Sequence, residues 1–186
     1  MSRMALEKLQ EKFGDAVLDT HNFRGDETAV VDPSVIIEML TWLRDDPELK
    51  FDMLTDLTAV DYLPAEPRFA VVYHLYSMDL RHRLRIKVPI SEETPELDSA
   101  HELWGCANWA EREIWDMYGI RFNGHPDPRR ILMYEEFVGH PLRKDYPKEK
   151  RQPLLRRPEP ELKEVARPGA PRPLTPLLYK DYDGQG

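Results

Sequence analysis

The sequence contains a single cysteine, Cys106, among 186 residues. One thiol cannot form an internal disulfide, and it is too few for a cysteine-based zinc site or for an iron–sulfur cluster held by this chain alone. Such scarcity of cysteine is typical of a reducing compartment, and we expect the cytoplasm.

Long apolar runs are also missing. No stretch approaches the roughly 18 apolar residues that a membrane-spanning helix needs. Residues 1–8 lack the apolar core of a signal peptide. If the protein works at a membrane, we therefore expect another chain to hold it there.

Basic charge is scarce in most of the chain. The net charge is −8, and residues 143–186 carry 11 Lys and Arg against 7 Asp and Glu, so residues 1–142 carry −12. Because phosphate binding needs a basic surface, this acidic body excludes nucleic acid as the main partner.

Hydrophobic periodicity predicts an α+β domain over residues 1–147. The predicted elements are a helix over 3–13, strands 16–21 and 28–31, a helix from Asp32 to Asp45, and strands 51–60, 69–78 and 81–90. This order favours two layers with a mixed sheet. Apolar and basic residues alternate in 81–90, which indicates one buried and one wet, basic face. Residues 91–99 are acidic and polar, and we expect a loop there.

Residues 148–186 differ in composition. Nine of the 17 prolines lie between Pro141 and Pro176, which excludes a helix bundle or a sheet interior. The pattern predicts an extended, partly polyproline tail. Its end, residues 177–182, is apolar and aromatic, which favours docking on a partner.

Between the predicted sheet and the tail lies a Trp-rich helix. At 100° per residue, a helix over 104–118 has one continuous apolar arc, and Glu111 falls inside it. Unpaired burial of a carboxylate is costly, so we expect Glu111 to be a structural acid bonded to an Arg or to main-chain N–H groups. The alternative is a proton-handling acid with a raised pKa. The same phase predicts an Arg112–Asp116 ion pair on the opposite side.

Trp109 also falls on the polar side of this helix. An exposed Trp beside charged residues is typical of a protein interface; the alternative is a small satellite core.

Two histidines, His125 and His140, each stand between Gly and Pro. A shared metal or a general base are alternatives, but neither has an obvious local ligand or acid partner, and we expect both to hydrogen-bond the main chain. The basic pairs 129–130 and 143–144 could bind phosphate, but no Gly-rich loop precedes a helix as that chemistry requires. We expect them to pair with acids of a neighbouring chain.

Two long stretches carry a family resemblance. They read Glu111-Arg-Glu-Ile-Trp-Asp-Met-Tyr-Gly-Ile-Arg-Phe-Asn-Gly-His-Pro-Asp-Pro-Arg-Arg-Ile-Leu132 and Gly139-His-Pro-Leu-Arg-Lys-Asp-Tyr-Pro147. Together with Leu57-Thr-Ala-Val-Asp-Tyr62, they closely resemble the 30-kDa subunit of respiratory complex I, which is the NADH–quinone oxidoreductase of bacteria. The resemblance covers residues 51–147. Pro128, where Leu is usual, and Arg121 depart slightly from the pattern.

The resemblance implies a cofactor-free peripheral-arm subunit on the cytoplasmic side of the bacterial inner membrane. Its partners would be other complex I subunits, chiefly the quinone-site (49-kDa-type) subunit and its cluster-bearing neighbours, with FMN, iron–sulfur clusters and quinone all in the partners. No residue would be catalytic, cofactor-binding or metal-binding. The motif residues would form scaffold and interface: Trp109, Glu111, Arg112, Glu113, Asp116, Tyr118, Gly119, Phe122, Gly124, His125, Pro126, Asp127, Arg129, Arg130, His140, Pro141, Arg143, Lys144, Asp145, Tyr146 and Pro147.

Two other functions stay open at this point. One is the equivalent subunit of a related membrane-bound hydrogenase or ferredoxin–plastoquinone reductase. The other is a stand-alone hydrolase that uses Glu111 or Glu113 with His125.

Overall fold

The computed structural model describes residues 2–152. Its helices and strands are α1 (Ser2–Phe13), β1 (Val17–Phe23), β2 (Asp26–Val31), α2 (Ile36–Asp45), β3 (Met53–Asp61), β4 (Phe69–Tyr76), β5 (Arg83–Ile90), β6 (Glu96–Asp98), α3 (Ala107–Tyr118) and β7 (Arg121–Asn123). The predicted order of helix, two strands, helix and three strands is confirmed. The predicted tail beyond Gln152 lies outside the described residues.

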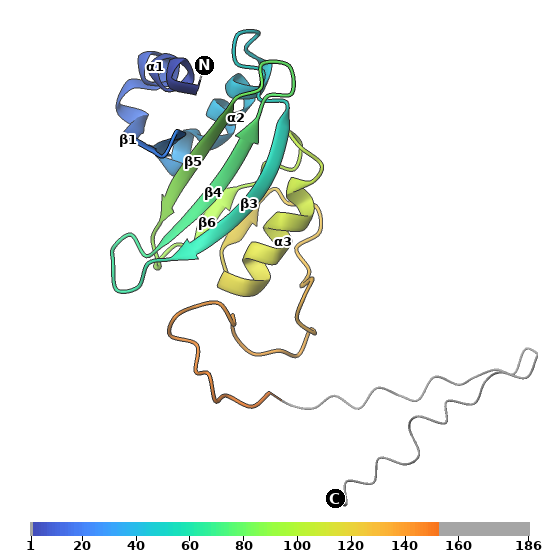
Figure 1. Cartoon of the computed structure of the whole chain (residues 1–186). Helices are drawn as coiled ribbons and strands as arrows, with labels where there is room; N and C mark the ends of the chain where they lie inside the picture. The colour runs from blue at the N-terminus through green and yellow to red at the C-terminus, as the bar shows by residue number, and fades with distance from the viewer. Residues whose placement is uncertain (1, 153–186) are drawn as a thin grey trace, which may run out of the picture. The chain divides into compact units, whose positions relative to one another are not determined.

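Five strands form one mixed sheet in the order β1-β2-β5-β4-β3 (Figure 1). Neighbouring strands are antiparallel except β2 and β5, which run parallel. A parallel pair cannot be joined by a tight turn, and α2, β3 and β4 fill the connection between them. The predicted mixed sheet is therefore confirmed.

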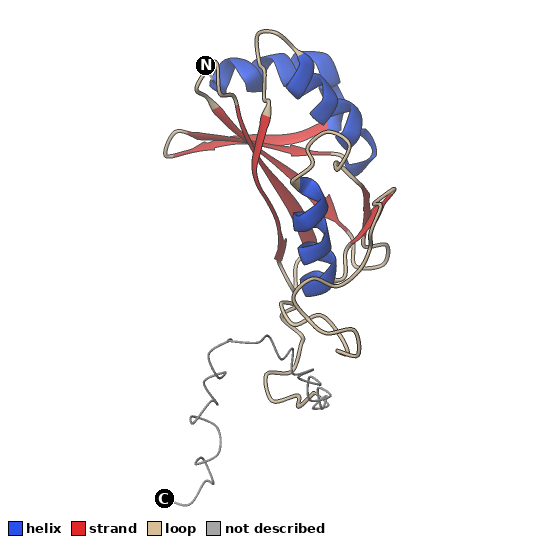
Figure 2. Ribbon diagram, turned by 90° about the vertical axis from the view of Figure 1, so that its right-hand side faces the viewer, coloured by secondary structure: helices blue, strands red, loops and turns tan. Residues whose placement is uncertain are grey.

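The helices gather on one side of this sheet (Figure 2). The core-facing side chains of the central strands alternate along β4 and β5: Phe69, Val71, Tyr73, Leu75, Leu84, Ile86, Val88 and Ile90. The intervening side chains of β5, Arg83, Arg85 and Lys87, are half-buried or exposed. On β5 one face is thus buried and the other carries basic side chains, as the alternation predicts. The prediction does not extend to β4, where Ala70 and Val72 on the same face are buried.

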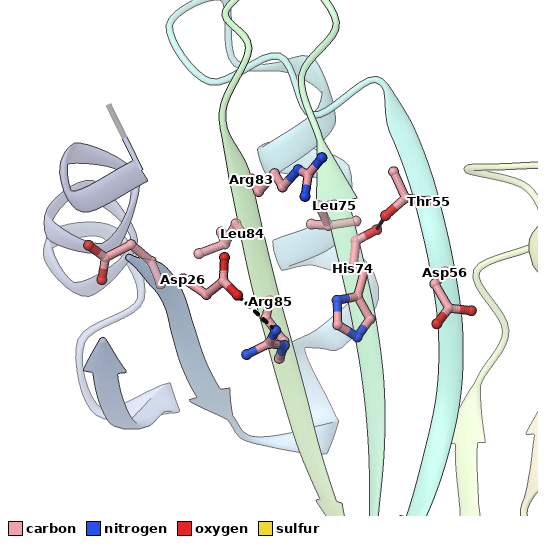
Figure 3. A pocket seen from close by; sticks show the side chains of 9 residues that line it. Asp26, Thr55, Asp56, His74, Leu75, Arg83, Leu84 and Arg85 are labelled. Carbon is pink, nitrogen blue, oxygen red and sulfur yellow. Dashed lines mark hydrogen bonds and ion pairs between the residues drawn. The ribbon is translucent and has the colours of Figure 1, made fainter. Parts of the chain in front are cut away.

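The open face carries a polar pocket of about 260 Å³ (Figure 3). In it, Arg85 pairs with Asp26 at 3.5 Å, and His74 faces Asp56 across β3 and β4. Burial, followed by the nearby Arg85, lowers the pKa of His74. The charges are thus balanced across neighbouring strands, as on an ordinary solvated sheet face.

Two predicted boundaries are wrong. The expected loop 91–99 contains β6, which pairs in parallel with β7 and brings Leu97 opposite Phe122. Strands of three residues are too short to show a period in the sequence. α3 begins at Ala107 rather than at 104, because the chain turns through Gly105. Trp104 is buried all the same, and its indole N–H donates to the carbonyl of Asp52 at 3.1 Å.

After β7 the chain runs through residues 124–152, here named the strap, without a helix or strand. Within residues 2–152 no helix is long and apolar enough to cross a membrane.

Candidate functional site

Glu111 lies on the buried side of α3, as the helical phase predicts, with 1% of its surface exposed. One carboxylate oxygen accepts the N–H of Ala100 at 2.7 Å, and the other accepts the Ser99 hydroxyl. No Lys or Arg of the described chain pairs with it. Burial raises the pKa of Glu111 to about 7, against the hydrogen bonds from Ser99 and Ala100. The predicted hydrogen bond from a main-chain N–H to Glu111 is therefore confirmed. The raised pKa is the feature that the proton-handling alternative expects.

His125 lies beside Glu111, with its Nε2 3.9 Å from the carboxylate. Its Nδ1 accepts the N–H of Asp127, so the ring proton lies on Nε2, which donates to the carbonyl of Asn108. The predicted main-chain bonding of His125 is confirmed. Because both ring nitrogens are used, His125 offers no free base to a hydrolytic mechanism.

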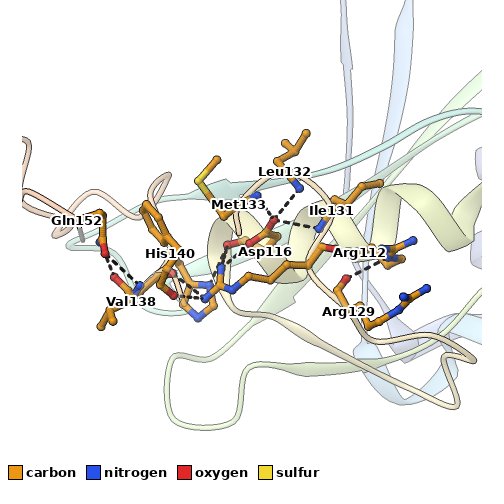
Figure 4. Close-up of polar contacts among 12 residues, drawn as sticks. Arg112, Asp116, Arg129, Ile131, Leu132, Met133, Val138, His140 and Gln152 are labelled. Atoms are coloured by element: carbon orange, nitrogen blue, oxygen red, sulfur yellow. Dashed lines mark hydrogen bonds and ion pairs between the residues drawn. The ribbon is translucent and has the colours of Figure 1, made fainter. Parts of the chain in front are cut away.

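Asp116 is fully buried, and it organises the strap (Figure 4). Its Oδ2 accepts the three consecutive main-chain N–H groups of Ile131, Leu132 and Met133, at 3.2, 2.9 and 2.8 Å. Its Oδ1 accepts from the guanidinium of Arg130. Burial alone would raise the pKa of Asp116, but these donors together hold it below its ordinary value. The carboxylate thus accepts main-chain N–H groups that a helix or strand would otherwise bond.

The predicted Arg112–Asp116 pair is wrong. Helical spacing places these side chains together, but the strap covers this side of α3 and supplies better partners. Arg112 donates to the carbonyls of Arg129 and Arg130 at 3.0 and 2.9 Å, and it stacks on Trp109 with 5.2 Å between the guanidinium and the ring centre. Trp109 is 62% exposed, so it belongs to no satellite core within the described residues.

The end of α3 is fixed by Gly119, which has φ +79°. A Cβ at this position would lie 2.6 Å from His140 Nε2 and 2.8 Å from Arg143 Nη2. The Nδ1 of His140 bonds the carbonyl of Asp116 at 3.0 Å, and Arg143 donates to the carbonyl of Tyr118 at 2.5 Å. The strap therefore closes over the helix terminus, and His140 makes the main-chain bond that we predict.

The far end of the strap is anchored on the sheet by Arg68. This guanidinium is 2% exposed and pairs with Asp61 at 2.8 Å and Asp145 at 2.6 Å. Asp61 also accepts the main-chain N–H of Lys144. Nothing in the sequence gives a reason to select Arg68. A single Arg between Pro67 and a strand does not reveal a contact with Asp145, 77 residues away.

The basic pairs were predicted to meet acids of a neighbouring chain. This is wrong for Arg130, which pairs with Asp116 of its own chain. Arg143 donates to the carbonyl of Tyr118 and the Lys144 amine to that of Leu63, and for these two residues the pairing stays a prediction. Arg129 is exposed and pairs with Asp127 in its own loop. Within residues 2–152, no three His, Cys, Asp or Glu side chains gather as metal ligands would.

Known proteins resemble this chain in sequence and in fold. Residues 29–152 match the family model of the 30-kDa subunit of respiratory-chain NADH dehydrogenase. The chain belongs to this family. It is 52% identical to the corresponding NADH-quinone oxidoreductase subunit of Citrifermentans bemidjiense over 143 residues, 77% of this chain and 88% of the relative. It is also 52% identical to that of Roseiflexus castenholzii over 142 residues, 76% and 82% of the two chains.

Two solved structures share the fold. One is a trypsin-resistant fragment (1–134) of Nqo5, with a TM-score of 0.59 and 32% identity, which covers 67% of this chain and 97% of the fragment. The other belongs to an archaeal membrane-bound sulfane sulfur reductase, with a TM-score of 0.64 and 22% identity, covering 79% and 86%. The second likeness shows the fold alone.

In this family member the other predicted site residues line the same helix, turn and strap. Glu113, Gly124, Pro126 and Pro147 are exposed, whereas Tyr118, Phe122, Pro141 and Tyr146 are half-buried. The Tyr146 ring closes over Gly139 and stacks on Phe137 at 5.9 Å.

Large apolar side chains point outward from the strap. Leu132, Val138 and Leu142 are 56%, 59% and 51% exposed, although the main chain around them is held by Asp116, Arg130 and His140. Sequence reasoning missed these three residues, because a segment without helical or strand period gives no side-chain direction. Exposed apolar side chains are typical of a binding surface where they form one contiguous patch.

Proposed function

We propose that this chain is a cofactor-free peripheral-arm subunit of proton-translocating NADH–quinone oxidoreductase, and that it braces the quinone-site (49-kDa-type) subunit. The surface that we assign to this contact consists of Trp109 and the exposed strap residues Leu132, Val138 and Leu142. The partner complex would pass electrons from NADH through FMN and iron–sulfur clusters to quinone, with all these groups in neighbouring chains.

The main support for the proposal is that the charged side chains around α3 bond the main chain of the strap. Asp116, Arg112 and Arg130 direct their polar atoms at the main chain of the strap, whereas a catalyst needs such groups free to meet a substrate. The result is a segment whose main chain is held by side-chain hydrogen bonds rather than by secondary structure, and which turns apolar side chains outward. A preorganised surface of this kind loses little conformational entropy when a partner binds.

Further support comes from the chain's chemistry. One cysteine cannot hold an iron–sulfur cluster, and the two bacterial relatives named above are NADH-quinone oxidoreductase subunits. We therefore assign the chain to the cytoplasmic side of the bacterial inner membrane, attached through its complex. We further propose that residues 1–147 form the domain and that residues 148–186 extend its contact with partner subunits.

The test is affinity purification of the tagged full chain from native membranes, with mass spectrometry of the partners. We expect the quinone-site subunit and an NADH-binding flavoprotein to co-purify, and we expect the chain purified alone to show neither flavin nor iron absorbance nor NADH oxidation. A nickel–iron hydrogenase subunit in place of the flavoprotein, or NADH oxidation by the isolated chain, would overturn the proposal.

A further inference from the structure

A pocket of about 480 Å³ lies between α3 and the turn that follows β7. Three of its walls are apolar: Trp115 from the helix, Phe122 from the strand and Pro128 from the strap. Glu111 and His125, whose side chains are 0% and 3% exposed, line its closed end.

The polar groups at the closed end are already satisfied. Both nitrogens of His125 bond the main chain, and both oxygens of Glu111 accept hydrogen bonds from residues 99 and 100. Burial raises the pKa of Glu111 to about 7, against these hydrogen bonds. The closed end therefore offers no free hydrogen-bonding atom, which favours an apolar occupant.

The mouth of the pocket is basic rather than apolar. Arg112 and Arg121 both line it. Arg112 is committed to strap carbonyls and to Trp109. Arg121 is exposed, and its guanidinium makes no hydrogen bond or ion pair with any residue between 2 and 152. A free guanidinium beside an apolar hollow is complementary to a carboxylate next to an apolar side chain.

We propose that this pocket receives an apolar or aromatic side chain of a partner subunit, and that an Asp or Glu close to it in the partner's sequence pairs with Arg121. Trp109, which is 62% exposed and stacks on the pocket-lining Arg112, adds an aromatic ring to the same surface. Trp and Arg are the residue types that dominate the centres of protein interfaces. The inference rests on the proposed function, because it specifies the chemistry of the partner at the same helix and strap.

The experiment places p-benzoyl-L-phenylalanine at Asn123, an exposed pocket-lining position, in the full chain within the assembled complex. A parallel sample carries the same crosslinker at Leu142, on the strap surface outside the pocket. The expected crosslink from position 123 is to a partner peptide that contains an apolar or aromatic residue with an Asp or Glu within about three positions. A crosslink to residues 153–186 of this chain, or to a peptide without that pattern, would overturn the inference.

The two samples separate the two proposals. If position 142 crosslinks to the quinone-site subunit and position 123 crosslinks to nothing, the pocket inference fails and the proposed function stands. If neither position crosslinks to any subunit, both fail.

A charge reversal provides an independent readout. We expect Arg121→Glu to reduce the amount of chain retained by the tagged quinone-site subunit roughly tenfold, with the loss greatest at low salt. Arg24→Glu, the same change in the exposed β1–β2 turn, serves as the control and should leave retention unchanged. Equal retention of the two variants would contradict the role of Arg121.

Discussion

Replacing Asp116 with Asn removes one charge from the centre of the strap network while keeping the shape of the side chain. The native carboxylate accepts three main-chain N–H groups and the Arg130 guanidinium. An amide has one acceptor oxygen, and its NH₂ group would face either those donors or Arg130. Breaking a buried ion pair by changing one partner costs about 3–5 kcal/mol. We expect the loss to fall first on the strap, which is held by side chains rather than by secondary structure.

Hydrogen exchange of the full chain measures this directly. A loss of about 3 kcal/mol in local opening free energy makes the protected amides of Ile131, Leu132 and Met133 exchange on the order of 100-fold faster. The sheet amides should change far less. Glu113→Gln is the matched control, because Glu113 is an exposed carboxylate on the same helix. Exchange at 131–133 within about threefold of the unmutated chain would disprove this role of Asp116.

Three further predictions concern buried charge and backbone shape. The fold raises the pKa of Glu111 from 4.5 to about 7, so folding favours the protonated side chain. The stability that this protonated side chain contributes is complete below about pH 4.5 and is lost as the pH rises through 7. Glu111→Gln should therefore gain up to about 3 kcal/mol relative to the unmutated chain between about pH 5 and 8 in urea denaturation; a constant difference would contradict this. Gly119→Ala should lower the free energy of unfolding by roughly 2–4 kcal/mol, because of the left-handed φ and the clash with His140 and Arg143. In Gly105→Ala the new Cβ has no neighbour within 4 Å, so the free energy of unfolding from thermal melting should change by no more than about 0.5 kcal/mol. Arg68→Met should lower the free energy of unfolding by roughly 3–5 kcal/mol, because it leaves Asp61 buried and unpaired. Adding Asp61→Asn should restore part of that stability. No recovery in the double variant would mean that the loss of this ion pair is not the cause.

Some of this site can be predicted from the sequence because the information is local. Helical phase alone places Glu111 among apolar neighbours, and alternation in β5 separates a buried face from a basic one. The family resemblance extends this to the whole of α3 and the strap. These predictions succeed because spacing along one element determines which way its side chains point.

The parts that fail depend on contacts between distant residues. Periodicity places Asp116 opposite Glu111, but it cannot show that residues 131–133 return to cover that side of the helix. The partner of Arg68 at Asp145 is likewise fixed by how the strap crosses the sheet. Sequence spacing therefore suggests a local ion pair at Arg112, where the fold provides long-range bonds to the main chain.

The α3–strap surface, as we propose, binds the quinone-site subunit and does no chemistry itself. Photocrosslinking from Leu142 tests this most sharply, because its side chain is 51% exposed while its main-chain N–H is fixed to the carbonyl of Met117 at 3.1 Å. In the assembled, active complex, we predict a crosslink to the quinone-site subunit with NADH–quinone reductase activity retained before illumination. An active complex in which position 142 crosslinks only to solvent-facing segments of this chain, or to no other chain at all, would contradict the proposed binding surface.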